Sequence, residues 1–230
     1  MTISLTWLGH SAFKLVIDGH ETLTDPFLTN NPLAAATPEQ VNPEIIFLSH
    51  AHGDHVGDSV AIARRTGAQV VCNAEMSYWF KNKDVQQVHG QNTGGGADYG
   101  FVRAKLTLAF HSSSFPDGTY GGQPNGLLLT AKASGQKIYF AGDTALFSDM
   151  QLIGDAGIDI AFLPIGDYFT MGIEDSIKAI SYLRPRLVVP MHYNTFDLIA
   201  QDGGAWANRV SSETDAQPIV LDPGGTFTLA

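Results

Sequence analysis

A cluster of histidine and aspartate side chains is the feature of this sequence with the clearest chemistry. Three imidazoles and one carboxylate lie within six residues, those of His50, His52, Asp54 and His55. Divalent metals of intermediate softness bind imidazole nitrogen together with some carboxylate oxygen. On a loop, ligands two residues apart can reach one ion while the next pair reaches another. The segment therefore predicts a metal site rather than a solvated histidine-rich loop.

Three further candidate ligands lie far from this segment, and each follows an apolar run typical of a strand. They are His111, Asp143 and His192, which follow the runs 106–110, 138–142 and 187–191. A strand that ends at a sheet edge places the next side chains at a cleft on a rigid support. Taken singly, each residue is explained equally well by a core or turn hydrogen bond. Together with the His50–His55 segment, they predict one composite metal site.

The elements that position these residues follow from hydropathy and turn signals. Strands over 3–8, 13–17 and 22–24 predict an antiparallel meander, and 44–48 is a buried strand that leads into the histidine segment. Helices are predicted at 58–66, 74–80, 148–155 and 174–183, and further strands at 69–72, 101–110, 126–131, 137–141, 159–163 and 187–190. The glycine run 94–96 lacks the Lys-Ser or Lys-Thr of a phosphate loop and predicts a hairpin turn.

Two β-rich segments, each followed by helices, predict two sheets packed face to face with helices outside. Every apolar face must be covered, so the expected fold is α/β (α+β), a four-layer αββα sandwich. Residues 1–230 show no linker, repeat or low-complexity segment, and 44% of them are hydrophobic. We therefore expect a single domain with one large core.

Composition excludes several classes of protein. Thirteen Lys and Arg against 23 Asp and Glu give a net charge of −10, which makes a nucleic-acid partner unlikely. The single cysteine, Cys72, lies in an apolar run, so we expect a buried structural thiol rather than a disulfide or a thiolate metal site. No signal peptide or long apolar segment is present, which predicts a soluble, cytoplasmic protein without membrane contact. A homo-oligomer is expected only because such assemblies are common.

The order of these ligands resembles that of the metallo-β-lactamase superfamily. Its pattern is His-x-His-x-Asp-His followed by a distant His, an Asp and a last His. Within the superfamily the chain is similar to the UPF0173 metal-dependent hydrolases, near the ascorbate-phosphate lactonase group, over nearly its whole length. The motifs that carry this similarity are Trp7-Leu8-Gly9-His10-Ser11, Thr24-Asp25-Pro26, Phe169-Thr170-Met171-Gly172 and Pro190-Met191-His192-Tyr193-Asn194-Thr195-Phe196. Ile173 stands where the family pattern has proline.

The resemblance implies a metallo-β-lactamase fold and two divalent metal ions. It assigns His50, His52 and His111 to one ion, Asp54, His55 and His192 to the other, and Asp143 to both. Zinc is the expected metal, with manganese, iron or nickel as alternatives. Two ions about 3.5–4 Å apart can supply a bridging hydroxide and polarise a substrate oxygen. Asp54 is then also a catalytic candidate, because it could orient this hydroxide or accept its proton.

Several residues are expected around the metals. His10 and Asp25 end the first and third strands, where they could hold ligating histidines by hydrogen bonds, with His10 alternatively a catalytic proton donor. Ordinary turn and core hydrogen bonding is the other interpretation of this pair. The candidate substrate-binding residues are Ser112, Asn125, Tyr193 and Asn194. Three aromatic residues either line the cleft or belong to the core, namely Trp79, Phe80 and Phe169.

The favoured function is hydrolysis of a small ester-like bond in a small-molecule substrate: a lactone, a phosphodiester or a phosphorylated sugar derivative. A ribonuclease-type phosphodiesterase is the first alternative, although the chain has no basic run. A redox role for iron lacks a flavin or other electron-carrier module. A non-enzymatic, metal-stabilised binding domain would be expected to close its coordination shell. The sequence has no Gly-x-Ser-x-Gly elbow of a serine hydrolase and no glycine-rich turn of a dinucleotide-binding enzyme, so neither function is predicted.

Overall fold

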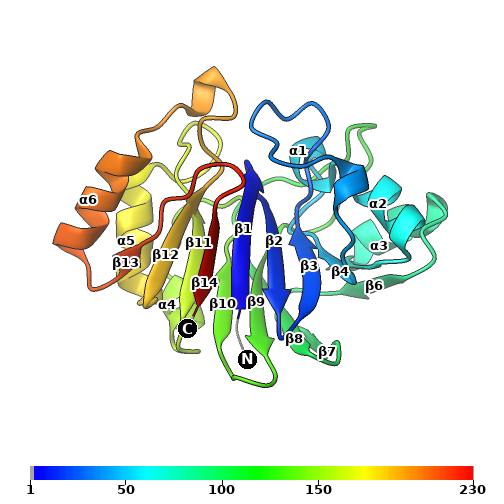
Figure 1. The fold of residues 1–230 in the computed structure, drawn as a ribbon, viewed down its shortest axis with the longest axis horizontal. Coiled ribbons are helices and arrows are strands. Elements are labelled where there is room, and N and C mark those ends of the chain that lie inside the picture. Colours follow the sequence, from blue (N-terminus) through cyan, green and yellow to red (C-terminus); the bar gives the residue numbers. More distant parts are fainter. Residues whose placement is uncertain (1–2, 230) are drawn as a thin grey trace.

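The computed structural model describes residues 3–229 as two mixed β-sheets packed face to face (Figure 1). The first sheet contains, in order, β14 (Thr226–Leu229), β1 (Ile3–Gly9), β2 (Ala12–Ile17), β3 (His20–Thr24), β4 (Ile45–Phe47), β5 (Gln69–Asn73) and β6 (Val88–Gln91). The second contains β13 (Gln217–Pro218), β12 (Leu187–Met191), β11 (Ile160–Pro164), β10 (Lys137–Phe140), β9 (Asn125–Ala131), β8 (Val102–Leu108) and β7 (Gly96–Asp98).

Helices flank the two sheets on opposite sides of the molecule. One side carries the 3-10 turn η1 (Pro38–Gln40), α1 (Gly53–Val56), α2 (Ser59–Thr66) and α3 (Ala74–Asn82). The other side carries α4 (Met150–Gly154), α5 (Ile173–Leu183), η2 (Asp197–Ile199) and α6 (Gly203–Glu213). This arrangement confirms the predicted αββα sandwich. Among the described residues, no helix has the length and apolar character needed to cross a membrane.

Strand direction explains why the candidate ligands meet. In the first sheet β1, β2 and β3 form the predicted antiparallel meander, and β4, β5 and β6 run parallel to β3. The second sheet repeats this topology, with β8, β9 and β10 antiparallel and β11, β12 and β13 parallel to β10. The carboxyl ends of β1, β3 and β4 therefore share one edge of the first sheet, and those of β8, β10, β11 and β12 share one edge of the second.

The core has two parts. The larger part fills the space between the sheets and extends under α4, α5 and α6, with Phe13 packed edge-to-face on Phe162 at 4.6 Å. The smaller part lies between the first sheet and α2 and α3, and includes the fully buried Cys72, as expected. Strands β11 and β12 are buried along their whole length because they are covered on both faces.

Four strands and two α-helices were not anticipated from the sequence: β6, β7, β13, β14, α1 and α6. The expected hairpin at 94–96 is wrong. This glycine run instead carries the chain from β6, at the edge of the first sheet, to β7, at the edge of the second. Helix α6 begins with two glycines, which are poor helix formers, and depends on tertiary contacts. Asp202 caps it by accepting from the Ala205 amide at 2.9 Å, and Trp206 is completely buried.

Because Phe13 fills the space between the sheets, Phe13→Ala is expected to lower the free energy of unfolding by about 3–5 kcal/mol. Urea titration of the purified variants measures this change. The control is Leu152→Ala, whose side chain is 70% exposed, and its effect is expected to stay within about 0.5 kcal/mol. Equal effects for the two variants would contradict the assignment of Phe13 to the core between the sheets.

Candidate metal centre

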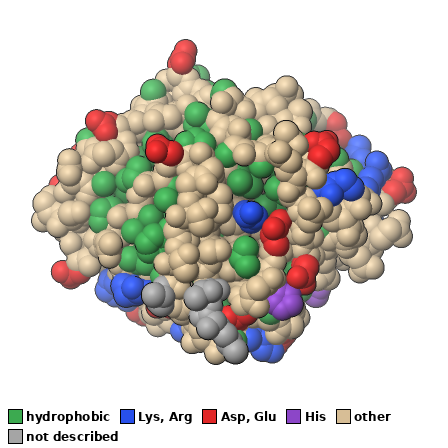
Figure 2. Space-filling view, viewed as in Figure 1, with side chains coloured by type: hydrophobic (Ala, Val, Ile, Leu, Met, Phe, Trp, Pro, Cys, Tyr) green, Lys and Arg blue, Asp and Glu red, His purple; other side chains and the backbone are tan. Residues whose placement is uncertain are grey.

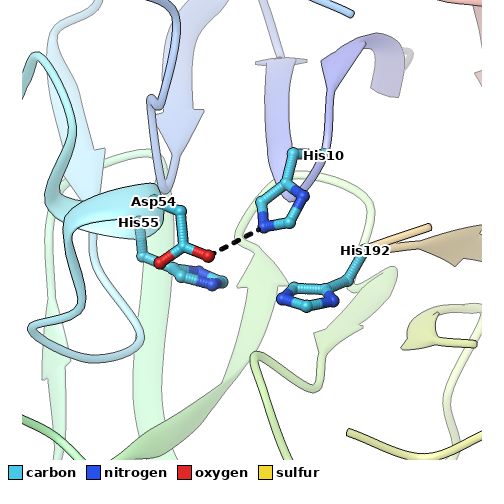
Figure 3. A group of neighbouring side chains, drawn as sticks. All are labelled: His10, Asp54, His55 and His192. Atoms are coloured by element: carbon cyan, nitrogen blue, oxygen red, sulfur yellow. Dashed lines mark ion pairs between the residues drawn. The ribbon is translucent and has the colours of Figure 1, made fainter. Parts of the chain in front are cut away.

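The structure brings the seven predicted ligands together where the strand ends of the two sheets meet. Six of them, all except Asp143, fall into two groups, in each of which the candidate ligand atoms lie within 4.8 Å of one another. The first group is His50, His52 and His111. The second is Asp54, His55 and His192, and it also includes His10. Figure 3 shows that the four side chains of the second group point toward one another from the end of β1, from α1 and from the end of β12.

Local backbone geometry sets these positions. His52 is the first residue before α1, so Asp54 and His55 lie on that one-turn helix, where an irregular loop was expected. Gly142 precedes Asp143 with φ of +62°, and a Cβ atom on it would lie 2.7 Å from the Ser49 Cβ. Only glycine allows the chains after β4 and β10 to approach so closely at this backbone angle. The tight approach of these two turns places Asp143 beside the histidine segment.

In the first group, His50 and His52 each have one ring nitrogen near a serine hydroxyl, and their other ring nitrogens lie close to each other. His50 Nδ1 lies 2.9 Å from the Ser49 hydroxyl, and His52 Nε2 lies 3.3 Å from the Ser112 hydroxyl. The remaining nitrogens, His50 Nε2 and His52 Nδ1, are 3.0 Å apart. Burial lowers the pKa of His50 and of His52, so both rings are neutral and keep a lone pair for a cation.

Asp143 links the two groups through a single oxygen. Its Oδ2 lies 3.0 Å from His192 Nε2, 3.2 Å from His55 Nε2 and 3.6 Å from His111 Nε2. Burial alone would raise the pKa of Asp143, but His192 and His55 outweigh this effect and hold it well below its usual range. The carboxylate is therefore charged, fully enclosed and positioned between the two groups.

Several buried polar atoms of the centre make no hydrogen bond among the described residues, although two of them lie within ion-pair distance of a carboxylate oxygen. They are His10 Nε2, His55 Nε2, His192 Nδ1 and Asp143 Oδ1. An unsatisfied buried polar atom costs about 1–3 kcal/mol, and native proteins rarely leave several of them side by side. Lone pairs of imidazole and carboxylate that converge in this way fit bound divalent cations. The residues present are thus a suitable donor set for the metals that the sequence predicts.

Asp25 holds both groups in place from behind. Its Oδ2 accepts hydrogen bonds from His55 Nδ1 at 2.8 Å and from the Ser49 hydroxyl at 2.5 Å, while Oδ1 accepts from the Ser49 amide at 2.8 Å. Ser49 in turn contacts His50 Nδ1, so one buried carboxylate orients a histidine of each group. These hydrogen bonds are the ones that the predicted orienting role of Asp25 requires, and the role itself stays a prediction.

His10 occupies a more central position than Asp25. Its Nδ1 is 2.8 Å from the Thr195 hydroxyl, and its Nε2 is 3.3 Å from Asp54 Oδ2, the ion pair marked in Figure 3. Burial, followed by the nearby His192, lowers the pKa of His10 to about 4. His10 thus faces the second group directly, whereas Asp25 contacts the outer nitrogen of a candidate ligand.

Of the four candidate substrate-binding residues, the structure brings only Ser112 into contact with the cluster. Asn125 is buried and donates from Nδ2 to the Thr93 hydroxyl and the Thr107 carbonyl.

The Tyr193 ring stacks on Trp7 with centroids 5.4 Å apart, and Asn194 is exposed and accepts from the Gln201 amide. His192 and Asn194 both have positive φ. The expectation that Tyr193 and Asn194 lie beside the metals finds no support in these contacts.

Other residues of the site had weaker signals in the sequence. Ser49 contacts the His50 ring, and Thr195 contacts the His10 ring. Ser49 directly precedes the histidine segment, and Thr195 lies in the motif that contains His192. Serine and threonine are nevertheless too common in turns to be chosen on their own. Among the aromatic candidates, Phe80 is fully buried in the core and Trp79 stacks on Phe115. Phe169 is 50% exposed.

Comparison with known proteins places the chain in a family. The profile of the β-lactamase superfamily domain matches residues 4–192. A UPF0173 metal-dependent hydrolase of Thermus thermophilus is 47% identical over 99% of both chains, and one of Shouchella clausii is 46% identical over 99% of this chain and 100% of its own. A solved metallo hydrolase from the archaeon Ignicoccus hospitalis has a TM-score of 0.91 and 38% identity, covering 100% of this chain and 99% of its own.

The fold and the clustered histidines and aspartates are thus those of the metallo-β-lactamase superfamily, whose members of this type are metal-dependent hydrolases. Within that superfamily, the chain belongs to the UPF0173 metal-dependent hydrolases.

Asp25→Asn is expected to weaken metal binding by about 10- to 100-fold, because the amide cannot accept from both His55 and Ser49 as the carboxylate does. Competition with a chelator of known affinity measures this change. Glu44→Gln is the matched control, since Glu44 holds His20 Nδ1 at 2.9 Å in an exposed pair. If Asp25→Asn binds metal as tightly as this control does, the carboxylate does not orient the ligands.

Proposed function

We propose that the chain hydrolyses a small ester-like bond with two divalent cations held by the seven clustered residues. The observation that carries this proposal is Asp143 Oδ2, which lies 3.0–3.6 Å from histidines of both groups and so has the position of a shared ligand. His50, His52 and His111 would hold one cation, and Asp54, His55 and His192 the other. Zinc is the proposed metal, with manganese, iron or nickel equally compatible with these donors.

Two bound cations about 3.5–4 Å apart would lower the pKa of a water molecule and polarise the substrate oxygen. The other contributions come from the chain itself. Asp54 has its Oδ2 beside the second group and is the proposed acceptor of the proton that leaves the attacking water. Burial raises the pKa of Asp54, but His10 and His55 outweigh burial and lower it, so the carboxylate is ionised.

His10 is the proposed donor to the leaving group. Its Nε2 lies 3.3 Å from Asp54 Oδ2, and the Thr195 hydroxyl 2.8 Å from Nδ1 fixes the ring. A proton accepted by Asp54 could then pass through His10 to the departing oxygen without leaving the site. Ser112, next to His52, is the proposed hydroxyl donor to the substrate. The substrate classes are those of an ester-like bond: a lactone, a phosphodiester or a phosphorylated sugar derivative.

Purified protein is expected to contain about two metal equivalents by elemental analysis and to hydrolyse members of a panel of lactones and phosphodiesters. His52→Ala and Asp143→Ala are each expected to lower kcat/KM by at least about 100-fold, with reduced metal content, because each removes a ligand. His89→Ala is the control, since His89 packs on Tyr99 and belongs to neither group. A metal-free protein with full activity, or ligand variants that match His89→Ala, would show the proposed function to be wrong.

A further inference from the structure

Large apolar side chains are exposed around the centre, where hydrolysis is proposed. Of the nine large hydrophobic residues that are exposed in the described chain, six lie in loops that follow the carboxyl ends of site-bearing strands. Scattered exposed hydrophobic residues need no explanation, whereas a group of them beside a site marks a binding surface. The apolar rim, as we name it, consists of the half-buried Phe27 and five of these six exposed residues, all except Tyr120: Phe110, Tyr168, Phe169, Phe196 and Leu198.

Contacts connect this apolar rim to the centre. The rings of Phe27 and Phe196 lie 5.9 and 5.8 Å from the His10 ring and 6.5 Å from each other. Phe110 directly precedes His111, and its amide donates to the hydroxyl of Thr144, the residue after Asp143.

The exposed aromatics after β11 are also tied to the centre. Tyr168 and Phe169, which are 68% and 50% exposed, lie in the loop 165–172. This loop abuts His192, because a Cβ on Gly166 would lie 2.2 Å from the His192 carbonyl oxygen. Leu198, in η2, follows the same histidine. The rim thus borders the centre on the side of β8, β11 and β12, with Phe27, after β3, as its member from the first sheet.

The loops around the centre carry no lysine or arginine. All thirteen Lys and Arg lie outside the loops that follow β3, β4, β8, β10, β11 and β12, namely 25–37, 48–58, 109–124, 141–149, 165–172 and 192–202. The same loops contain nine aspartates. In Figure 2 the top of the molecule, over η2 and the loop after β12, shows hydrophobic and acidic side chains but no Lys or Arg. These loops offer no guanidinium or ammonium group to bind a phosphate or carboxylate.

We infer that the site takes an uncharged lactone or ester with an aromatic or branched apolar substituent beside the scissile bond. The apolar rim would contact that substituent, with Phe196 and Phe27 nearest His10. This inference rests on the proposed hydrolysis and narrows it. An anionic group on the substrate away from the scissile bond, such as the phosphate of a sugar phosphate, would lie near aspartates and not near a lysine or arginine. Substrate discrimination would therefore come from apolar contact on one side and charge repulsion on the other.

Three γ-butyrolactones with a phenyl, methyl or carboxylate substituent on the γ-carbon test this inference, because all share one scissile bond. Ring opening by the metal-loaded protein is followed in a pH-stat. We expect kcat/KM for the phenyl lactone to exceed that for the methyl lactone by at least about tenfold, and the carboxylate lactone to be the poorest of the three. Phe196→Ala and Phe169→Ala are expected to reduce the phenyl-to-methyl ratio by at least about fivefold with unchanged metal content.

Leu152→Ala is the matched control, because it removes an exposed apolar side chain of α4 that lies outside the rim. It is expected to leave the ratio unchanged. Preference for the carboxylate lactone, or a ratio that neither phenylalanine variant changes, overturns the inference while the hydrolase proposal stands. Absence of lactone turnover also overturns it, and absence of phosphodiester turnover as well would overturn the proposed function. Loss of an oligomer in both variants, seen by light scattering with an unchanged ratio, would identify the rim as a subunit interface instead.

Discussion

The buried charge of Asp143 is the constraint on which the arrangement of this protein depends. A carboxylate without full hydrogen bonding is costly in a water-poor interior, and here one of its oxygens has no partner among the described residues. Its other oxygen faces three imidazoles, and the pKa of one of them, His55, is raised well above the usual value. Burial lowers the pKa of His55, but Asp143 and Asp25 outweigh that effect. A protonated His55 can offset only part of the charge, whereas cations would also satisfy the unpaired nitrogens.

The repeated topology of the two sheets holds Asp143 and the histidines around it on rigid strands. Each half supplies an antiparallel meander followed by parallel strands, so the carboxyl ends of strands far apart in the sequence share one edge. Asp25 from the end of β3 then connects His55 on α1 to His50 after β4. Orientation of candidate ligands thus depends on the strands themselves. The segment 25–44, which has no strand or α-helix, contributes only Asp25 to the hydrogen bonds that hold His50 and His55.

Sequence periodicity predicted the parts of the fold whose burial pattern is local. Strands β1 to β3, α5 and the αββα layers were predicted because alternation or helical spacing identifies the buried face of each element. The edge strands β7, β13 and β14 are two to four residues long and are defined by their partners, which no local pattern records. The ligands were predicted because histidine and aspartate after apolar runs are rare. The side-chain contacts of Tyr193 with Trp7 and of Asn194 with the Gln201 amide depend on tertiary structure, which no local pattern records.

Electrostatics connects the centre with the surface around it. The net charge of −10 and the aspartates of the surrounding loops give a negative field at the entrance, so cations are attracted to the clustered donors and anions are repelled. Bound metal would then be the main positive charge near a substrate. Polarisation would act on the scissile bond alone, because no protein cation competes for the substrate elsewhere in these loops. What remains for recognition is surface contact, which the exposed aromatic side chains of the apolar rim can provide to an uncharged molecule.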